Sequence, residues 1–258
     1  MSTVQGQHVW YELMTTDLEA AQAFYTQVVG WDSADSGMPG IDYRLMSAGP
    51  AQVAGMMTLP QEACDRGARP GWLGYVAVDD VDAKAAELQQ AGGALHKPPE
   101  DIPGVGRFAV VADPGGATFC LFTGLSAEAP PSPPAGTPGM MGWHELQAGD
   151  LAREWDFYST LFGWTQDTAM DMGALGIYQM FKTGGADAAG GMMTRLAEVP
   201  HPFWLYYVNV DAIDAAVARI DAAGGRVIGG PMEVPGGSWI VNALDPQGAV
   251  FALVAPRR

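Results

Sequence analysis

Two glutamates that could act as bases stand in matching surroundings far apart in the chain. Glu12 and Glu145 each occupy the third position of the pattern Trp-x-Glu-Leu, and 133 residues separate them (145 − 12). Alternate residues of a strand share a face, so a strand that turns its tryptophan towards a cavity turns its glutamate there too. Burial in an apolar cavity raises the pKa of a carboxyl group towards the range that suits a general base. A structural role is equally open, in which each carboxylate accepts hydrogen bonds and orients its strand.

The residues expected around these glutamates are mostly apolar or aromatic. Because alternate residues of a strand share a face, one tyrosine hydroxyl in each half is also expected to face the cavity. A cavity with so few polar groups is typical of small-molecule sites. For the tryptophans and methionines of this set, packing in the core is the alternative to ligand binding. Arg107 could bind the anionic group of a ligand, and the alternative is that its side chain is solvated. The expected ligand-binding residues are Trp10, Met56, Tyr75, Arg107, Trp143, Met192 and Tyr207.

Each glutamate belongs to a strand that leads into a helix. Asp17 and Asp150 follow the two strands, where a carboxylate can cap the free N–H groups of a first helical turn. Apolar residues then recur at helical spacing up to Gly30 and Gly163, and glycine there commonly ends a helix in the left-handed conformation. The sequence therefore predicts the same strand, capped helix and Gly-Trp turn twice.

The repetition extends over nearly the whole chain. Gly-Met-Met-Thr occurs at 55–58 and again at 191–194, and an Asp-Pro turn precedes the last strand of each half at 113 and 245. Further strand–helix units are expected at 72–91 and 204–223, so each half is itself built of two similar modules.

A proline-rich segment separates the two halves. Prolines fix the backbone and remove hydrogen-bond donors, so this segment is expected to be an extended linker without a core of its own. The expected organisation is a first domain at 1–124, a linker at 125–139 and a second domain at 140–258.

Composition narrows the classes of partner. The 258 residues carry 13 Lys and Arg against 29 Asp and Glu, a net charge of −16. Such a chain repels phosphate backbones and anionic lipid, so neither nucleic acid nor a membrane is expected as a partner. Two cysteines fit a reducing compartment, and no signal peptide or long apolar run is present, so a cytoplasmic location is expected. The oligomeric state is left open.

Taken in order, these motifs resemble those of the vicinal oxygen chelate superfamily, which includes glyoxalases, bleomycin-resistance proteins and dioxygenases. The resemblance rests on the Asp-Leu-x-x-Ala-x-x-Phe-Tyr helix leading to Gly-Trp, the Val-Asp helix entries, the Gly-Gly stops and the Asp-Pro-x-Gly turns. It implies an α+β fold of four βαβββ modules, which form two domains whose sheets curl into cup-shaped half-barrels. The Trp-x-Glu-Leu opening is similar to that of a tandem glyoxalase-like subgroup. Which modules pair cannot be read from the sequence.

The resemblance also locates the positions at which relatives hold a divalent metal. None of these positions carries His, Asp or Glu in this chain, and Cys120 is the single residue among them with a soft donor atom. A divalent site needs three or four converging donors, so we expect no metal and no cofactor. The positions are Trp10, Leu73, Cys120, Trp143, Leu205 and Ala252.

The preferred hypothesis is a metal-independent protein that sequesters a small hydrophobic or aromatic molecule for detoxification or resistance. The alternative is a glyoxalase-like lyase, isomerase or hydroxylase-like enzyme with Glu12 or Glu145 as base and Tyr75 or Tyr207 as proton donor. A third reading is a scaffold without pockets. The sequence leaves open whether catalysis occurs and whether one or both cavities are active.

Overall fold

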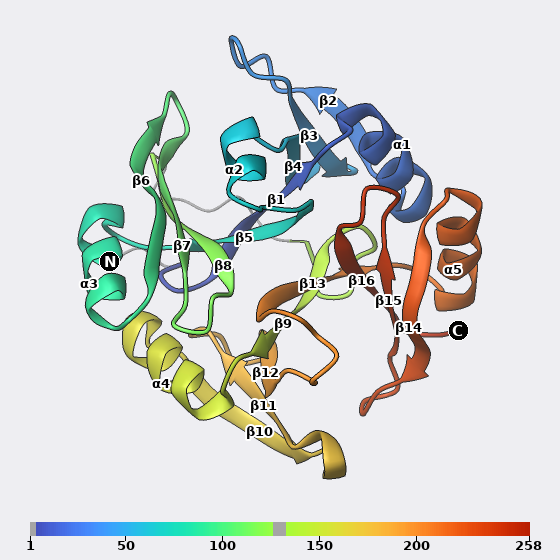
Figure 1. Cartoon of the computed structure of the whole chain (residues 1–258). Coiled ribbons are helices and arrows are strands. Elements are labelled where there is room, and N and C mark those ends of the chain that lie inside the picture. The colour runs from blue at the N-terminus through green and yellow to red at the C-terminus, as the bar shows by residue number, and fades with distance from the viewer. Residues whose placement is uncertain (1–3, 126–132) are drawn as a thin grey trace. The chain divides into compact units, whose positions relative to one another are not determined.

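The computed structural model describes residues 4–125 and 133–258, and it has the predicted α+β architecture (Figure 1). Residues 126–132 of the expected linker lie outside the described residues. None of the helices in the described ranges is long and apolar enough to cross a bilayer. The elements of the first half are β1 (His8–Thr15), α1 (Leu18–Val29), β2 (Asp32–Asp35), β3 (Tyr43–Ala48), β4 (Ala51–Thr58), α2 (Gln61–Asp65), β5 (Gly71–Ala77), α3 (Val81–Gln90), β6 (Ala94–Ile102), β7 (Gly106–Ala112) and β8 (Thr118–Gly124). Those of the second half are β9 (Met141–Ala148), α4 (Leu151–Phe162), β10 (Thr165–Asp171), the 3-10 helix η1 (Gly173–Leu175), β11 (Ile177–Lys182), β12 (Gly190–Thr194), β13 (Phe203–Asn209), α5 (Ile213–Ala222), β14 (Arg226–Glu233), β15 (Trp239–Leu244) and β16 (Val250–Ala255).

Helices α1 and α4 begin and end at the residues that the sequence indicates. Asp17 Oδ1 accepts from Ala20 N over 3.0 Å, and Asp150 Oδ1 accepts from Arg153 N over 2.9 Å. Gly30 and Gly163 then end the helices with φ of +89° and +71°, a conformation that glycine adopts without a steric penalty. Each helix therefore has a fixed length and a fixed direction of departure from its strand.

The strands form two eight-stranded mixed sheets with the same order in both repeats. The order is β2-β3-β4-β1-β5-β8-β7-β6 in one sheet and β10-β11-β12-β9-β13-β16-β15-β14 in the other. The Gly-Met-Met-Thr strands β4 and β12 run parallel to β1 and β9, and Glu12 is paired with Gly55 as Glu145 is with Gly191. Because the registers match, residues of the two repeats can be compared position by position.

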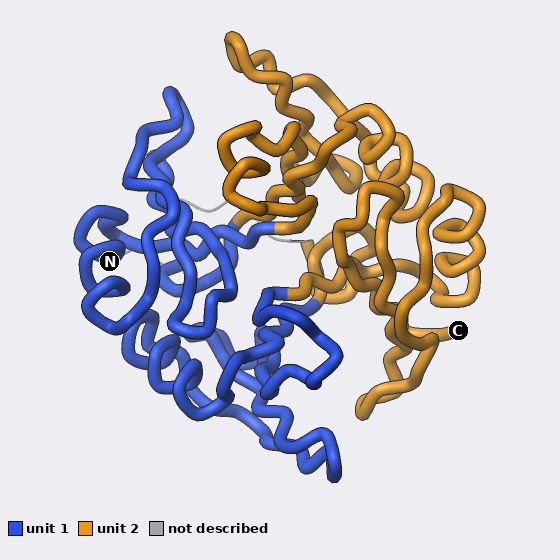
Figure 2. The backbone as a smooth tube through the Cα atoms, in the orientation of Figure 1, with its two compact units in different colours: residues 1–9, 73–130, 143–204 blue, residues 10–72, 131–142, 205–258 orange. Residues whose placement is uncertain are grey.

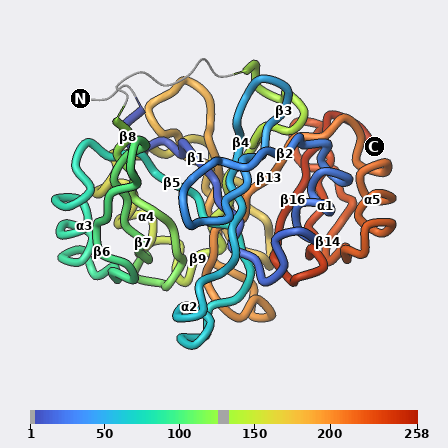
Figure 3. The backbone as a smooth tube through the Cα atoms, turned by 90° about the horizontal axis from the view of Figure 1, so that it is seen from above, coloured from blue at the N-terminus to red at the C-terminus, as the bar shows by residue number. Residues whose placement is uncertain are grey.

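Compact units of the chain combine modules from both repeats (Figure 2). Unit 1 consists of Met1–Val9, Leu73–Pro130 and Trp143–Trp204, and unit 2 of Trp10–Trp72, Pro131–Gly142 and Leu205–Arg258. In unit 1, α3 packs beside α4, and in unit 2, α1 packs beside α5 (Figures 1 and 3). Within the sheets the first module pairs with the second and the third with the fourth, whereas the compact units group the second module with the third and the first with the fourth.

Aromatic side chains fill the space between helix and sheet in each unit. In unit 1 the rings of Tyr158 and Trp164 stack at 5.0 Å, and Trp164 stacks on Phe181 at 4.5 Å. In unit 2 Tyr25 packs against Trp31 and Trp72 at 5.9 and 5.2 Å. These rings are almost completely buried. Since large aromatic groups dominate core energetics, they hold α4 and α1 rigidly on their sheets.

Candidate functional site

A chain of polar side chains crosses β9 and β11 in unit 1. Trp143 Nε1 donates to Tyr178 Oη over 2.8 Å, and Tyr178 Oη donates to Glu145 Oε2 over 3.1 Å. Gln147 Nε2 donates to the other carboxylate oxygen, Glu145 Oε1, over 2.7 Å. Trp143, Glu145 and Gln147 alternate along β9 and so lie on one face, as the sequence predicts. We call these four residues the Glu145 cluster.

A glycine makes room for the tyrosine of this cluster. Gly191 of β12 is paired with Glu145, and a Cβ atom added to it would lie 2.4 Å from Tyr178 Oη and 2.1 Å from a ring carbon of the same residue. Any larger residue would therefore push the phenol away from the carboxylate. The glycine of the Gly-Met-Met-Thr pattern thus has a steric reason, which is the close approach of the tyrosine ring.

Electrostatics keep the Tyr178 phenol protonated. Burial raises its pKa well above the ordinary value of 10.0, and the nearby Glu145 carboxylate raises it further, while the bond from Trp143 acts in the opposite direction. A neutral phenol donates to the carboxylate, and a donor aimed at a carboxylate favours its charged form. Glu145 is 9% exposed, so the cluster holds an almost completely buried carboxylate in a fixed position on the face that it shares with the half-buried Trp143.

Unit 2 contains the corresponding arrangement on β1 and β3. Trp10 Nε1 donates to Tyr43 Oη over 2.9 Å, and a Cβ atom added to Gly55 would lie 1.8 Å from the same oxygen. Glu12 is 5% exposed and is paired with Gly55. Trp10, Glu12, Tyr43 and Gly55 thus repeat the positions of Trp143, Glu145, Tyr178 and Gly191.

The register separates the two methionines of each Gly-Met-Met-Thr pattern onto opposite faces. Met56 is paired with Leu13 and Met192 with Leu146, and all four side chains are fully buried. The following methionines, Met57 and Met193, are paired with Met14 and Gln147, which share the faces of Glu12 and Glu145. A ligand beside the glutamates would therefore meet Met57 or Met193, whereas Met56 and Met192 belong to the core.

Tyr75 and Tyr207, whose hydroxyl groups the sequence predicts to face the cavities, lie on β5 and β13. Both are almost completely buried, with exposed fractions of 4% and 3%. Tyr75 is paired with Cys120 and packs against Phe108 at a ring distance of 6.2 Å. Tyr207 is paired with Ala252. Tyr75 belongs to unit 1 and Tyr207 to unit 2, so each lies in an aromatic or apolar part of its own sheet.

Arg107 lies at the surface between two carboxylates. Its Nε and Nη2 atoms donate to Asp82 over 2.6 and 2.9 Å, and its Nη1 atom donates to Asp101 over 2.8 Å. A ligand anion would have to compete with both aspartates for the guanidinium group. Anion binding by Arg107 remains a prediction from the sequence alone.

The donor set does not fit a divalent metal. Among residues 4–125 and 133–258 no group of three or more His, Cys, Asp or Glu side chains lies close enough to hold an ion. The six positions at which the resemblance places metal ligands carry tryptophan, leucine, alanine or cysteine, and Cys120 is buried in the sheet between Tyr75 and Val110. A single buried thiol does not supply the three or four donors that a divalent ion needs, so we derive no chemistry through a metal.

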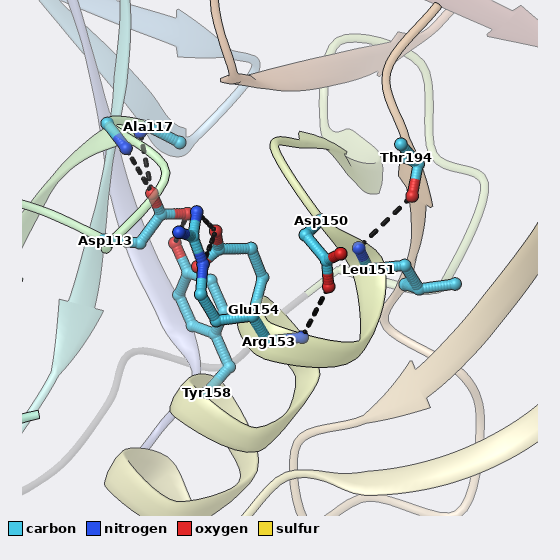
Figure 4. A network of polar contacts seen from close by, with 9 residues as sticks. Asp113, Ala117, Asp150, Leu151, Arg153, Glu154, Tyr158 and Thr194 are labelled. Atoms are coloured by element: carbon cyan, nitrogen blue, oxygen red, sulfur yellow. Dashed lines mark hydrogen bonds and ion pairs between the residues drawn. The ribbon is translucent and has the colours of Figure 1, made fainter. Parts of the chain in front are cut away.

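A second buried polar group joins α4 to the turn between β7 and β8 (Figure 4). Asp113 Oδ1 accepts from the backbone N–H groups of Gly116 and Ala117, both over 2.8 Å, and Asp113 Oδ2 accepts from Tyr158 Oη over 3.1 Å. Glu154, which is completely buried, accepts from Arg153 at Oε1. Its Oε2 atom has no hydrogen-bond partner within the described part of the chain. In unit 2 the same turn, Asp245 with Tyr25, is repeated without the glutamate, because Ala21 stands there.

Sequence reasoning missed Tyr43 and Tyr178, which complete the two clusters. Each lies on the strand before Gly-Met-Met-Thr, and both follow weakly patterned segments whose strands were not predicted. A usable signal was present nonetheless. A glycine at a position that faces an expected cavity requires a neighbouring side chain to lie over it, and an aromatic residue on the adjacent strand is the natural candidate.

Comparisons with known proteins agree with this architecture. The family model described as Glyoxalase/Bleomycin resistance protein/Dioxygenase superfamily matches residues 7–121 and 140–253. The protein named "Putative glyoxylase CFP32" of Mycobacterium tuberculosis is 34% identical over 257 residues, which cover 98% of this chain and 95% of that protein. "Anthracycline biosynthesis protein DnrV" of Streptomyces peucetius is 31% identical over 264 residues, covering 98% of this chain and 94% of that protein.

Solved structures extend the comparison to the fold. The Mn(II)-bound glyoxalase from Novosphingobium aromaticivorans superposes with a TM-score of 0.67 at 17% identity, covering 99% of this chain and 83% of that chain. The 2,3-dioxygenase LapB from Pseudomonas sp. KL28 gives a TM-score of 0.63 at 13% identity, covering 99% and 93% of the two chains. At these identities the likeness concerns the fold alone.

Proposed function

Because the chain belongs to the glyoxalase/bleomycin resistance protein/dioxygenase superfamily, we propose that it is a metal-independent member that binds a small hydrophobic or aromatic molecule. The observation that carries the proposal is the Glu145 cluster, in which a carboxylate is fixed by Tyr178 and Gln147 on a face shared with Trp143 and Met193. An indole and a thioether provide apolar contact, and the carboxylate provides one strong hydrogen-bond acceptor.

The chemistry of the cluster favours a planar ligand with hydroxyl groups. A carboxylate accepts from a phenolic O–H more strongly than a neutral group does, since charge-assisted hydrogen bonds are about twice as strong. A relative named as an anthracycline biosynthesis protein is consistent with a polycyclic aromatic ligand. Sequestration of such a molecule for detoxification or resistance needs burial and stacking and no bond making. The acidic surface makes a small molecule, rather than nucleic acid or a membrane, the expected partner.

A glyoxalase-like lyase or isomerase is the second candidate, and the name of the mycobacterial relative favours it. In this case Glu145 or Glu12 removes a proton next to a carbonyl group, and Tyr75 or Tyr207 returns one. The two donors on Glu145 oppose this role, because both carboxylate oxygens already accept hydrogen bonds and a substrate proton would have to displace one of them. Binding is therefore preferred to general-base catalysis.

Titration of tryptophan fluorescence with quinizarin, a planar dihydroxyanthraquinone, tests the proposal. We expect saturable quenching, and an affinity about tenfold lower for Glu145→Gln, since about 1.4 kcal/mol corresponds to tenfold and one charged acceptor is lost. Unsubstituted anthraquinone, which cannot donate to Glu145, should bind the wild type and Glu145→Gln equally. Glu12→Gln is the matched variant in unit 2 and reports whether both halves bind.

A turnover assay separates the second candidate from the first. The protein is incubated with methylglyoxal and glutathione, and consumption of the α-oxoaldehyde adduct is followed. Turnover that disappears in Glu145→Gln or Glu12→Gln would replace sequestration by catalysis. Absence of quinizarin quenching together with absence of turnover would remove both candidates.

A further inference from the structure

A hollow lies on the outer face of unit 1, between the start of α4 and the strands β10 and β11. Its volume is about 520 Å³, within the range of small-molecule sites. Gln179 of β11 lines it, while the neighbouring Tyr178 belongs to the Glu145 cluster on the opposite face of the same strand. The hollow is therefore separate from the proposed ligand site. Its lining residues are Asp150, Leu151, Ala152, Trp155, Asp156, Gln166, Ile177, Gln179 and Thr194.

The walls of the hollow are apolar on two sides. Trp155 projects from α4 and is half-buried, and Ile177 on the facing strand is 43% exposed. Leu175 and Met172, which precede Ile177 in the chain, are also exposed, by 46% and 41%. An indole and neighbouring aliphatic groups that remain in contact with water offer a stacking surface for the body of a ligand.

The polar groups of the hollow carry negative charge. Asp150 and Asp156 both line it, and none of the lining residues is Lys, Arg or His. Two of the first-turn N–H groups of α4, which otherwise attract anions, already have acceptors: Arg153 N donates to Asp150 Oδ1 over 2.9 Å and Leu151 N donates to Thr194 Oγ1 over 3.2 Å (Figure 4). Two carboxylates outweigh the partial positive charge of a helix terminus, so the hollow favours a cation.

The first repeat supplies its own cation at the corresponding position. Arg44 of β3 is paired with Met56 as Gln179 is paired with Met192, so Arg44 and Gln179 occupy equivalent places in the two repeats. Arg44 Nε donates to Asp42 Oδ1 over 2.7 Å, and Asp42 stands where the second repeat has Ile177. The place of Trp155 is taken by Gln22. The second repeat therefore has no guanidinium group at this position. It has the indole of Trp155 and the carboxylate of Asp156 beside the hollow instead.

We propose that this hollow binds a small organic cation with an aromatic or alkyl body, such as an arylalkylamine. The body lies against Trp155 and Ile177, and the ammonium group lies near Asp156 at the rim. A cation beside an indole gains further from the electron-rich face of the ring. The site has its own ligand, and its occupancy does not depend on whether the Glu145 cluster binds or catalyses.

Binding of 2-phenylethylamine, followed by the indole N–H signals of ¹⁵N-labelled full-length protein, tests the proposal. The Trp155 signal is identified by its absence in Trp155→Gln, which introduces the residue of the first repeat. We expect a saturable shift of the Trp155 signal and an affinity about tenfold lower for Asp156→Asn. In Trp155→Gln, binding is followed by the backbone amide signals of the residues that line the hollow, and their saturable shifts should be lost. Far-UV circular dichroism establishes that the variants are folded.

Neutral and charge controls keep the test specific. The isostere 2-phenylethanol has the same body without the charge and should bind at least about tenfold more weakly. Asp187→Asn removes an exposed carboxylate from the same unit outside the hollow, and it should change the affinity by less than about twofold. Equal binding of the amine and the alcohol, equal effects of Asp156→Asn and Asp187→Asn, or no shift of the Trp155 signal would each overturn the proposal.

Discussion

The hydroxyl group of Tyr158 donates to Asp113 Oδ2 over 3.1 Å and thereby joins the two repeats within unit 1. Tyr158 belongs to α4 of the second repeat, and Asp113 belongs to the Asp-Pro turn of the first. Trp204 Nε1 completes the arrangement by donating to the same hydroxyl over 2.9 Å. Unit 2 repeats it with the chain order reversed, because Tyr25 of the first repeat donates to Asp245 of the second.

Tyr158→Phe should destabilise the protein by about 2 kcal/mol. The change leaves the Trp204 N–H group and one Asp113 oxygen buried without their partner, and an unsatisfied buried polar group costs about 1–3 kcal/mol. Urea unfolding measures the loss. Tyr25→Phe is the matched variant and should lose a similar amount, whereas Thr160→Ala on the exposed side of α4 should change the stability by less than about 0.5 kcal/mol. An unchanged midpoint in Tyr158→Phe would show that the hydroxyl contributes nothing.

Glu154→Gln should make the protein more stable at neutral pH. Burial raises the pKa of Glu154 above its ordinary value and the neighbouring Asp113 raises it further, while Arg153 lowers it. A raised carboxyl pKa means that the folded state binds the proton more tightly, so stability falls as pH rises from the unfolded pKa through the folded one. The neutral amide removes this loss. We expect the free energy of unfolding at neutral pH to rise by an amount of the order of 1 kcal/mol. Loss of the ion pair with Arg153 reduces this gain, although only in part because the Arg153 side chain is half exposed.

The pH profile provides the diagnostic measurement for Glu154. Unfolding free energies of wild type and Glu154→Gln are compared from pH 4 to pH 8, and the difference between them should grow with pH. The buried histidines act in the opposite direction: burial lowers the pKa of His144 to about 4 and that of His8 well below 6.5, so their contribution is lost as pH falls. They are present in both proteins and cancel in the difference. A difference that shrinks as pH rises would contradict the expected sign.

The helices and their caps could be predicted because their signals are local. Each of these two helices is 12 residues long, and a residue next to each end marks its limits: Asp17 and Gly30 for α1, and Asp150 and Gly163 for α4. The cap contacts are those that the sequence predicts. Helix α5 differs, because the Val-Asp pattern before it places Asp211 at the helix entry, whereas Ala212 occupies the cap position without a side-chain bond. The fold followed from the order of such local signals in two copies.

The packing of modules from different repeats could not be predicted, because it depends on contacts distant in sequence. The tyrosines of the clusters were missed for another reason, since the strands that carry them have no clear sequence pattern. Tyr25 and Asp245 lie 220 residues apart, and no local pattern links them. The methionine pairs illustrate a second limit. Adjacent strand residues always face opposite ways, so only the register with β1 and β9 decides which methionine lies beside the glutamate.

Treatment with a chelator should leave the stability and the quinizarin affinity of the protein unchanged. The positions expected for metal ligands provide, apart from the Cys120 thiol, no donor atom, and a lone buried thiol does not hold a divalent ion. Thermal unfolding and fluorescence titration before and after dialysis against EDTA measure both properties. Stoichiometric zinc, nickel, iron or manganese that survives purification, with a melting temperature lowered by its removal, would contradict the proposal of a metal-independent protein.

Gly191→Ala should disrupt the Glu145 cluster while leaving the rest of the sheet folded. The added methyl group would lie 2.1 Å from a ring carbon of Tyr178, closer than any real contact, so the ring must move away from Glu145. Overpacking of this kind costs about 1–3 kcal/mol, and the lost phenol donor should weaken quinizarin binding about tenfold. Gly185→Ala is the control, because no atom lies within 4 Å of its added Cβ and its backbone is not left-handed. It should match the wild type in both stability and affinity. Full binding by Gly191→Ala would mean that the ligand does not depend on the position of Tyr178, and the cluster would then lose its place in the proposed function.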